Sequence, residues 1–525
     1  MGLNTNRVLY KIFEEYVLKQ GEKDFLIFEK DPNQIVKWTY SEFLNDVKRV
    51  ILYLTDIGIS KGEVITIHMD NNPIHILFEL AASYMGAIVL PTDPLCTEYE
   101  LKYFITHSES KMVVVEPSKI CLVEKLSKEI DIGIITLAYS SNINQKSKYF
   151  VIDDDLKRYN PSSLDIMNEQ ENTSIVMYLY TSGTTSKPKA VMISNAAIEY
   201  GARVLSKHTN LVKDDRHLIS LPLFHAAAQF HALWPSIVSG SSIVLTSRFS
   251  ASRFFEQAYI YNVSVAALFG APLRFLLNQP KREFDNIHNL RNITFAQSLT
   301  DSMYMEWSNR FKVPLQQLWG MTETVGLPIM SPISLKNRNL QAMGKSVFGY
   351  DCRIISEEEE NVSWASEGQL IVKCIPGLTA MTGYYKEVRK TEEIFQEIDN
   401  SIWLLSGDTV YVDAEGFFYF VDRGKDLIKR GGENISTVQV ESIIMEIPDV
   451  IDVCVTSILD SLRDEKVVAA VVLTENSNIT SERIKNYCSE KLSSFKVPSE
   501  FIFVKALPRT SVGKIQKEKV KKFFN

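Results

Sequence analysis

The sequence contains few cysteines, and none in a pattern that forms a disulfide framework or binds metal. Six of its 525 residues are cysteine, scattered singly without a C-x-x-C pair: Cys96, Cys121, Cys352, Cys374, Cys454 and Cys488. A chain of this length can bury a hydrophobic core without disulfide bonds, and scattered thiols are typical of proteins in a reducing compartment. The cysteines therefore give no support for a structural zinc site, and they favour a cytoplasmic location.

The sequence also lacks an excess of positive charge. It has 57 Lys and Arg against 64 Asp and Glu, which gives a formal net charge of −7. Nucleic acids and anionic membranes attract basic surfaces, so this balance predicts neither of them as a partner. With 45% hydrophobic and 23% charged residues, the composition is that of a globular protein. The length predicts about three or four structural units.

A membrane-spanning segment is not expected either. The first residues, MGLNTNRVLYKIFEEY, do not include the apolar core of a signal peptide, and Asn6 stands where a myristoylation signal requires Ser or Thr. Between Arg216 and Arg248 the chain has no Asp, Glu, Lys or Arg, but it contains three histidines and two prolines. A bilayer helix would have to hide those groups, so we expect a buried interior segment there.

What the sequence does contain is an alternation of strand-like and helix-like stretches. Residues 39–42 have capping-box spacing ahead of one helical pattern, and residues 73–84 carry another. The strand-like runs are VITIHMD (64–70), AIVLP (87–91), MVVV (112–115), IIT (134–136), SIVMYLY (174–180), SIVLT (242–246) and VSVAALF (263–269). Short apolar strands separated by helices predict an α/β fold with βαβ units and buried, largely parallel sheets.

The pattern changes near residue 340, where shorter strands and turns take over. The later strand-like and helix-like runs are GQLIV (368–372), FFYFVD (417–422), a strand at 450–458, a strand at 467–474 and a helix at 480–493. We therefore predict a large N-terminal domain of several subdomains, residues 1–423, with mostly buried mixed sheets. A small α+β C-terminal domain, residues 424–525, should follow it.

One loop has the composition of a phosphate site. The residues directly after the strand-like run at 174–180 are TSGTTSKPK (181–189), rich in small hydroxylated residues and lysine. Backbone N–H groups and hydroxyls in such a loop can bind a polyphosphate while lysines balance its charge. The spacing is not that of a Walker A loop. Taken alone, the same composition would equally suit a polar surface turn.

Further segments follow this loop in a fixed order along the chain. They are LPLFH (221–225), LWGMTET (318–324), WLLSGDTVYVDAEGFFYFVDR (403–423), KDLIKRGGENIS (425–436) and LPRTSVGKI (507–515). In order and spacing the whole set resembles the adenylate-forming superfamily of acyl-CoA synthetases, adenylation domains and luciferases, in its acyl-CoA synthetase type. The first loop and IKRGGENIS (428–436) look closest to the carnitine/crotonobetaine-CoA ligase branch.

The resemblance implies a two-step reaction and a set of ligands. A carboxylic acid reacts with ATP to give an acyl-adenylate and pyrophosphate, and coenzyme A then takes the acyl group as a thioester. It implies ATP, Mg²⁺ and coenzyme A as ligands, and a C-terminal domain that moves between the two steps. A carrier-protein thiol or an amine as acceptor remains an alternative, as does a catalytically silent nucleotide-binding regulator. Intact Lys514, Glu323 and Asp408 argue against the silent regulator.

The resemblance also assigns roles to catalytic residues by position. Lys514 matches the lysine that bridges the carboxylate and the α-phosphate, where a fixed positive charge is needed because two anions meet. Glu323 matches the Mg²⁺ ligand, and Thr322 is placed to bond the α-phosphate. His225 matches an aromatic position beside the reacting groups, although a lone histidine in an apolar run is otherwise a core residue.

The remaining assignments concern ligand binding and domain motion. The phosphates are assigned to Thr181, Ser182, Gly183, Thr184, Thr185 and Lys189; adenine to Trp319; the ribose to Asp408 and Arg423; the pantetheine arm to Gly431 and Gly432; and the hinge to Lys425. Trp319 stands where the family usually has tyrosine, and Ser186 and Ala190 stand where its loops usually have glycine.

The acyl pocket is the least typical part of the sequence. Ala226, Ala227, Phe295 and Gly320 are the residues we expect in its wall, and residues 295–298, FAQS, replace a stretch that is normally rich in Gly and Ala. No acidic residue follows Phe224 before Arg248, and a buried ammonium without a partner would be costly. We therefore predict an apolar or mildly polar small-molecule carboxylic acid, aliphatic or aryl, rather than an α-amino acid. An acyl carrier protein is the alternative partner.

Overall fold

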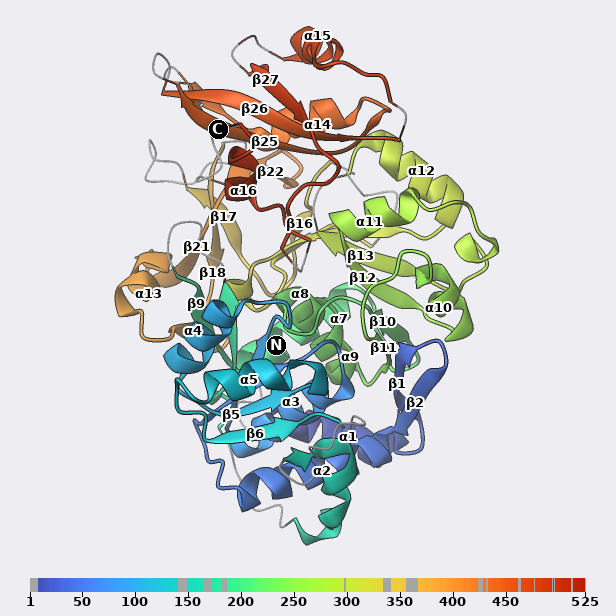
Figure 1. The fold of residues 1–525 in the computed structure, drawn as a ribbon, viewed down its shortest axis with the longest axis vertical. Coiled ribbons are helices and arrows are strands. Elements are labelled where there is room, and N and C mark those ends of the chain that lie inside the picture. Colours follow the sequence, from blue (N-terminus) through green and yellow to red (C-terminus); the bar gives the residue numbers. More distant parts are fainter. Residues whose placement is uncertain are drawn as a thin grey trace.

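The computed structural model describes most of the chain. The described residues are 8–139, 149–164, 171–181, 187–296, 299–333, 341–355, 367–423, 428–430, 433–460, 464–475, 477–492, 494, 496–510 and 513–524. They form four sheets, three of which are built from residues before 424 and one from residues after it. In Figure 1 the last sheet, coloured orange to red, caps one end of the long axis.

The first large sheet has eight strands in the order β19-β9-β8-β4-β3-β5-β6-β7. Its strands are β3 (Val64–His68), β4 (Ile88–Thr92), β5 (Ser110–Val115), β6 (Ile134–Leu137), β7 (Phe150–Val151), β8 (Ile175–Thr181), β9 (Lys189–Ser194) and β19 (Gly383–Tyr384). The pairs from β7 to β8 are parallel, whereas β9 pairs antiparallel with both β8 and β19. Five strands predicted from the sequence are confirmed here.

The second large sheet has nine strands in the order β16-β15-β14-β13-β12-β10-β11-β1-β2. Its strands are β1 (Asp24–Asp31), β2 (Gln34–Thr39), β10 (Arg216–Ile219), β11 (Ser242–Thr246), β12 (Val265–Phe269), β13 (Asn292–Ala296), β14 (Leu315–Trp319), β15 (Ile329–Met330) and β16 (Lys345–Ser346). The strands β1 and β10 to β14 run parallel to one another, which places their carboxyl ends along one edge, whereas β2 and β15 pair antiparallel with β1 and β14. The sequence predicted only β11 and β12.

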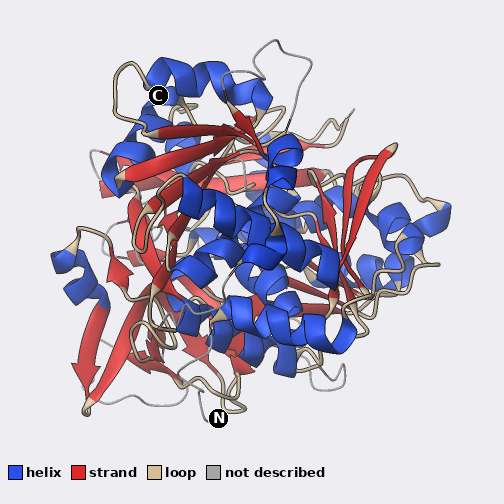
Figure 2. Ribbon diagram, turned by 90° about the horizontal axis from the view of Figure 1, so that it is seen from below, coloured by secondary structure: helices blue, strands red, loops and turns tan. Residues whose placement is uncertain are grey.

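Helices fill the space between the two large sheets. These are α1 (Leu9–Gln20), α2 (Tyr40–Asp56), α3 (Pro73–Met85), α7 (Asn195–His208) and α9 (Trp234–Ser239). One apolar cluster joins them to both sheets, and every residue of α3 is buried. Figure 2 shows helices gathered in the middle with strands on either side. The predicted capping box of α2 is confirmed, since Thr39 and Glu42 bond each other's backbone N–H.

Other helices cover the outer faces of the same sheets. The helices α4 (Glu98–Ser108) and α5 (Ile120–Leu126) pack on the first sheet, and α10 (Phe254–Ile260), α11 (Gly270–Leu277) and α12 (Asp301–Phe311) pack on the second. Both sheets are therefore buried on two faces, which explains the continuous apolar runs of their strands. The α/β class with mixed sheets is confirmed.

The charge-free stretch between Arg216 and Arg248 is an interior segment, as predicted. It forms β10, the short helix α8 (Ala226–Ala228), a π-helical turn (Gln229–Leu233), α9 and β11. The wide turn ends two residues before Pro235, whose missing N–H and bulky ring make a regular α-turn unfavourable there. In the part of the chain that the structure describes, no helix is both long and apolar enough to cross a bilayer.

The two remaining sheets are smaller and largely antiparallel. The third contains β17 (Cys352–Ile355), β18 (Glu367–Lys373), β20 (Phe395–Ile398), β21 (Ser401–Val412) and β22 (Phe418–Arg423), with α13 (Val388–Ile394) beside it. The fourth contains β23 (Ile428–Arg430), β24 (Glu433–Ile435), β25 (Val450–Asp460), β26 (Asp464–Leu473) and β27 (Glu500–Phe503), with α14 (Thr437–Met445), α15 (Ser481–Lys491) and α16 (Lys517–Lys521).

The fourth sheet has an apolar cluster of its own, made with α14 and α15. The strand β22 still pairs within the third sheet, whereas β23 pairs within the fourth. The chain therefore passes from the third sheet to the fourth between residues 423 and 428. The boundary at 423/424 stays a prediction, because residues 424–427 lie outside the described part of the chain.

Candidate active site

One large cleft collects most of those residues singled out by the sequence that the structure describes. It has a volume of about 1770 Å³ and is lined from both the large N-terminal part and the C-terminal part of the chain. The predicted residues on its wall are Thr181, Lys189, His225, Ala226, Trp319, Gly320, Thr322, Glu323, Asp408 and Lys514. These residues are scattered over more than half of the chain, so only the fold brings them together.

Two of the predicted pocket residues do not face this cleft. Phe295 is fully buried against the outer helices of the second large sheet, where its ring lies 6.3 Å from that of Tyr304. Ala227 is packed in the core between the large sheets. Side chains alternate across a strand, so the next residue on β13, Ala296, faces the cleft in place of Phe295. The expectation that Phe295 and Ala227 form the acyl pocket is corrected accordingly.

Several predicted ligand-binding residues lie outside the described part of the chain. They are Ser182, Gly183, Thr184, Thr185, Lys425, Gly431 and Gly432. Arg423 is described as the last residue of β22, where its backbone pairs with Asp408 on β21. The roles assigned to these residues stay predictions.

His225 lies where the loop after β10 enters α8. Its Nδ1 accepts a hydrogen bond from the N–H of Ala227 at 3.2 Å, so Nε2 carries the proton, and its ring makes an edge contact with Phe269 at 5.7 Å. Burial, together with the smaller effects of the charges of Lys514 and His231, lowers the pKa of His225 to about 3. The imidazole is therefore neutral at physiological pH, and it borders the cleft as an aromatic surface with one N–H donor.

Buried polar side chains that the sequence did not single out hold the loop before this histidine. Asn71 donates to the carbonyl of Leu221 at 2.9 Å and accepts from the N–H of Leu223 at 2.7 Å. Gln229 donates to the carbonyl of Leu223 at 2.6 Å and to Oε1 of Glu79 at 2.7 Å. Nothing in the local sequence pairs these positions, which come from different elements of the central layer.

Glu323 lies in a 3₁₀ turn (Thr322–Thr324) that begins beyond Gly320 and Met321, the two residues after β14. Its side chain is buried at the wall of the cleft, and its Oε1 accepts a hydrogen bond from the hydroxyl of Tyr384 at 2.7 Å. Nζ of Lys189 lies 3.9 Å from the centre of the same tyrosine ring. Tyr384, which the sequence did not single out, therefore contacts both a carboxylate predicted to hold Mg²⁺ on the phosphates and an ammonium predicted to bind the phosphates.

The chemistry of this carboxylate fits Mg²⁺. The ion takes oxygen ligands and usually keeps several waters, with only one or two protein carboxylates and the phosphates of a substrate completing its shell. Glu323 supplies one such carboxylate at the cleft wall. No group of three or more His, Cys, Asp and Glu side chains suited to a metal was found among the described residues.

Trp319 and Asp408 form a single unit in the cleft. The indole Nε1 donates to Oδ2 of Asp408 at 2.8 Å, and both side chains are buried. Asp408 follows Gly407, whose φ of +72° favours glycine, and its N–H donates to Oγ of Ser406 at 3.0 Å. The motif Ser-Gly-Asp thus forms an irregularity within β21, opposite a register shift in its pairing with β18, and the carboxylate that follows it contacts the indole. An aromatic platform and an acceptor for hydroxyl groups lie side by side.

Lys514 reaches the cleft from a tight turn near the end of the chain. The N–H of Thr510 donates to the carbonyl of Lys514 at 2.7 Å, and the N–H of Gly513 donates to the carbonyl of Thr510 at 2.8 Å. Gly513 has a φ of +82°, which favours glycine at this position. The charge of Lys514 is close enough to lower the pKa of His225, so the C-terminal unit brings a cation to the aromatic wall.

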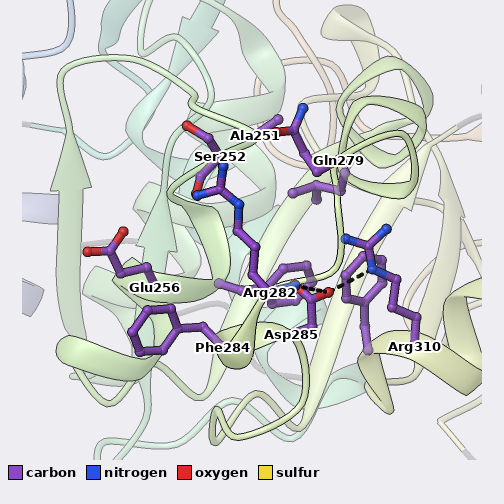
Figure 3. A pocket seen from close by; sticks show the side chains of 11 residues that line it. Ala251, Ser252, Glu256, Gln279, Arg282, Phe284, Asp285 and Arg310 are labelled. Atoms are coloured by element: carbon purple, nitrogen blue, oxygen red, sulfur yellow. Dashed lines mark hydrogen bonds and ion pairs between the residues drawn. The ribbon is translucent and has the colours of Figure 1, made fainter.

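A second hollow is too small to bind a substrate. Figure 3 shows it beside α12, with Arg310 directed at Asp285, and its volume is about 10 Å³. Nε of Arg310 lies 2.8 Å from Oδ2 of Asp285, and Nη1 donates to the carbonyl of Leu277 at 2.8 Å. This space holds about one water molecule. Its ion pair secures the end of α12 and has no contact with the large cleft.

Comparisons with known proteins agree with this geometry. The model of the AMP-binding enzyme family matches residues 13–385, and that of the AMP-binding enzyme C-terminal domain matches residues 439–514. A crotonobetaine/carnitine–CoA ligase of Escherichia coli O139:H28 (strain E24377A / ETEC) is 29% identical over 99% of this chain and 100% of its own. The corresponding ligase of Escherichia coli O17:K52:H18 (strain UMN026 / ExPEC) is 30% identical over the same shares.

Solved structures share the fold over nearly the full length. ATP-bound MatB from Rhodopseudomonas palustris has a TM-score of 0.86 at 23% identity and covers 98% of this chain and 99% of its own. The anthranilate CoA ligase AuaEII in complex with anthranoyl-AMP has a TM-score of 0.88 at 22% identity and covers 99% of this chain and 98% of its own. The resemblance inferred from the motifs is confirmed: the chain belongs to the AMP-binding enzyme family, within the adenylate-forming superfamily and its acyl-CoA synthetase type.

Proposed function

We propose that this AMP-binding enzyme is an AMP-forming acid–CoA ligase. It joins a carboxylic acid to the α-phosphate of ATP with release of pyrophosphate, and then transfers the acyl group to coenzyme A. The observation that carries this proposal is one cleft in which Lys514 lies beside neutral His225, Glu323 and the Trp319–Asp408 pair. A cation, a candidate metal ligand and a nucleoside platform are the three parts that adenylation needs.

In the first step, Lys514 bridges the acid's carboxylate and the α-phosphate. Both groups are anions, and a fixed ammonium stabilises the negative charge that builds up as the carboxylate attacks. His225 contributes no charge of its own, because its pKa is lowered to about 3, and its ring packs beside the reacting groups. The hydroxyl of Thr322, on the same wall, bonds the α-phosphate.

The nucleotide lies along the remaining wall of the cleft. Trp319 stacks on the adenine, and Asp408, already oriented by the indole N–H, accepts the ribose hydroxyls. Glu323 would hold Mg²⁺, which supplies positive charge to the triphosphate. Lys189 faces the same phosphates from the end of the loop after β8, and the ring of Tyr384 supports it.

Coenzyme A is the acceptor that the comparisons favour. The relatives that match over the full chain are named CoA ligases, and this supports a CoA thioester over transfer to a carrier-protein thiol or an amine. The silent nucleotide-binding regulator is not favoured either, because Lys514, Glu323 and Asp408 all line one cleft. In the second step, we propose that the C-terminal domain rotates about Lys425 and that Gly431 and Gly432 approach the pantetheine arm.

The substrate is a small carboxylic acid without an α-ammonium group. The cleft wall next to His225 carries Ala226 and, from β13, Ala296, and neither supplies a charge to pair such a group. The relatives and neighbours are named for crotonobetaine or carnitine, anthranilate and benzoate. Short aliphatic acids and aryl acids are therefore the first candidates for this chain.

The test is pyrophosphate release across a panel of carboxylic acids, with and without coenzyme A. We expect at least one acid to release pyrophosphate and to give a thioester only when coenzyme A is present. Lys514→Ala should lower the adenylation rate on the order of 10²–10³-fold, whereas Lys519→Ala, on the exposed face of α16, should not change it. Adenylation at the wild-type rate in Lys514→Ala would refute the mechanism.

A further inference from the structure

An ion pair joins the C-terminal unit to the N-terminal part beside the cleft. Nη1 of Arg274, on α11, lies 3.3 Å from Oδ1 of Asp452, on β25. The two side chains are 22% and 14% exposed, so both charges are largely removed from water. Removing one partner of a buried pair leaves the other charge uncompensated, which is strongly unfavourable. The pair therefore favours the arrangement of the two parts seen here.

The same carboxylate also braces the turn that carries the catalytic lysine. Oδ2 of Asp452 pairs with Nη2 of Arg509, and Nη1 of Arg509 donates to the carbonyl of Gly513. The backbone of Arg509 forms a bridge with Ile515 on the other side of the turn. Arg509 therefore contacts both sides of the hairpin that carries Lys514 and stabilises its conformation. One carboxylate connects α11 of the N-terminal part to this hairpin.

Arg274 has no other role that its surroundings reveal. It lines the cleft, and its Nε is buried without a hydrogen-bond partner in the structure. Burial lowers the pKa of its guanidinium and Asp452 raises it, so the cation depends on this carboxylate for its stability there. An alternative role, direct contact with a substrate through Nε, makes a different prediction and is separated by the experiment below.

We propose that Arg274 is a positioning residue for Lys514. Through Asp452 and Arg509 it holds the Lys514 hairpin in the cleft for adenylation, without contacting the reacting atoms. When the bridge is broken, the C-terminal unit occupies this arrangement for a smaller fraction of the time, and the adenylation rate falls with that fraction. The proposal rests on the function proposed above, because the effect is on the adenylation step.

The test combines Arg274→Gln with the catalytic variant. We expect Arg274→Gln to lower kcat for ATP–pyrophosphate exchange about tenfold while KM for ATP is unchanged, and Arg274→Lys to recover part of the loss. In a Lys514→Ala background, Arg274→Gln should cause no further loss, because residues that act as one unit are not additive. Arg353→Gln is the matched control, since Arg353 pairs at 3.1 Å with Asp351, only two residues before it in the chain. It should leave exchange unchanged.

A second measurement does not depend on activity. Small-angle X-ray scattering should give a larger radius of gyration for Arg274→Gln than for the wild type and for Arg353→Gln. An unchanged kcat in Arg274→Gln would overturn the proposal and show that Arg274 has no role in adenylation. A further loss of about tenfold in the Lys514→Ala background would overturn it in favour of direct contact between Arg274 and the substrate. If the wild type exchanges pyrophosphate with no acid, the proposed function fails, and an unchanged radius of gyration would then overturn the bridge as well.

Discussion

The hydroxyl of Tyr384 offers the sharpest test of how the cleft prepares its metal ligand. It donates to Oε1 of Glu323 at 2.7 Å, and both side chains are buried. The ring of the same tyrosine faces the ammonium of Lys189 at 3.9 Å. Tyr384→Phe deletes only the hydroxyl and keeps the ring, so it separates the support of the carboxylate from the support of the lysine.

The expected magnitude follows from the kind of bond that is lost. A hydrogen bond to a charged group contributes about 1.5–3 kcal/mol when its partner is buried. If the lower end of that range acts on the geometry of the carboxylate, the concentration of Mg²⁺ that gives half-maximal exchange should rise about tenfold. KM for the acid should not change, because the acyl wall, which includes Ala296, lies on another strand.

The assay is ATP–pyrophosphate exchange measured against Mg²⁺ concentration at saturating ATP and acid. Tyr385→Phe is the matched control: the hydroxyl of the adjacent tyrosine donates to exposed Glu109 at 3.0 Å, where a hydrogen bond contributes little. Tyr384→Leu also removes the ring, and should raise KM for ATP in addition. An unchanged Mg²⁺ dependence in Tyr384→Phe would show that Tyr384 does not orient Glu323, and the reasoning would fail.

Two further predictions concern stability and the acyl wall. Burial raises the pKa of Glu79 to about 8, so the stability that its neutral form contributes is complete below the unfolded pKa of 4.5 and is lost as pH rises through about 8. The free energy of unfolding of Glu79→Gln should therefore rise relative to that of the wild type by about 1.4 kcal/mol per pH unit within that window. Parallel profiles of Tm against pH for the two proteins from pH 5 to 8 would contradict this. Phe295→Ala should cost about 3–5 kcal/mol of stability without changing acid preference. Ala296→Leu should leave Tm nearly unchanged but lower kcat/KM for bulky acids. If instead Phe295→Ala changed the acid preference and Ala296→Leu did not, Phe295 would line the acyl pocket after all.

The sequence predicted strands best where they are apolar throughout. All residues of β3 and β4 and the last four of β5 are buried, so a largely hydrophobic run marked each of these strands. It missed β13 and β14, whose runs are interrupted by polar residues. The structure explains this, because Asn292 donates to Gln316 at 2.8 Å inside the sheet. A polar residue that finds its partner on the neighbouring strand looks, in one sequence, like a position facing solvent.

The sequence by itself determined which chemical groups are available and in what order they occur. Lys514, Glu323, Asp408 and His225 were named by their match to the motifs of the adenylate-forming superfamily, which are short segments readable in the sequence. Their presence on one cleft wall agrees with that reasoning.

Only the tertiary structure decided which side chains support these groups and which way the strand residues face. Tyr384 lies 61 positions from Glu323, and Asp452 lies 178 positions from Arg274. Such pairs form because the order of strands in a sheet differs from their order in the chain, so distant elements become neighbours. The face that Phe295 presents was likewise fixed by the helices packed on β13. Contacts of this kind depend on packing between elements, which a local pattern of residues does not contain.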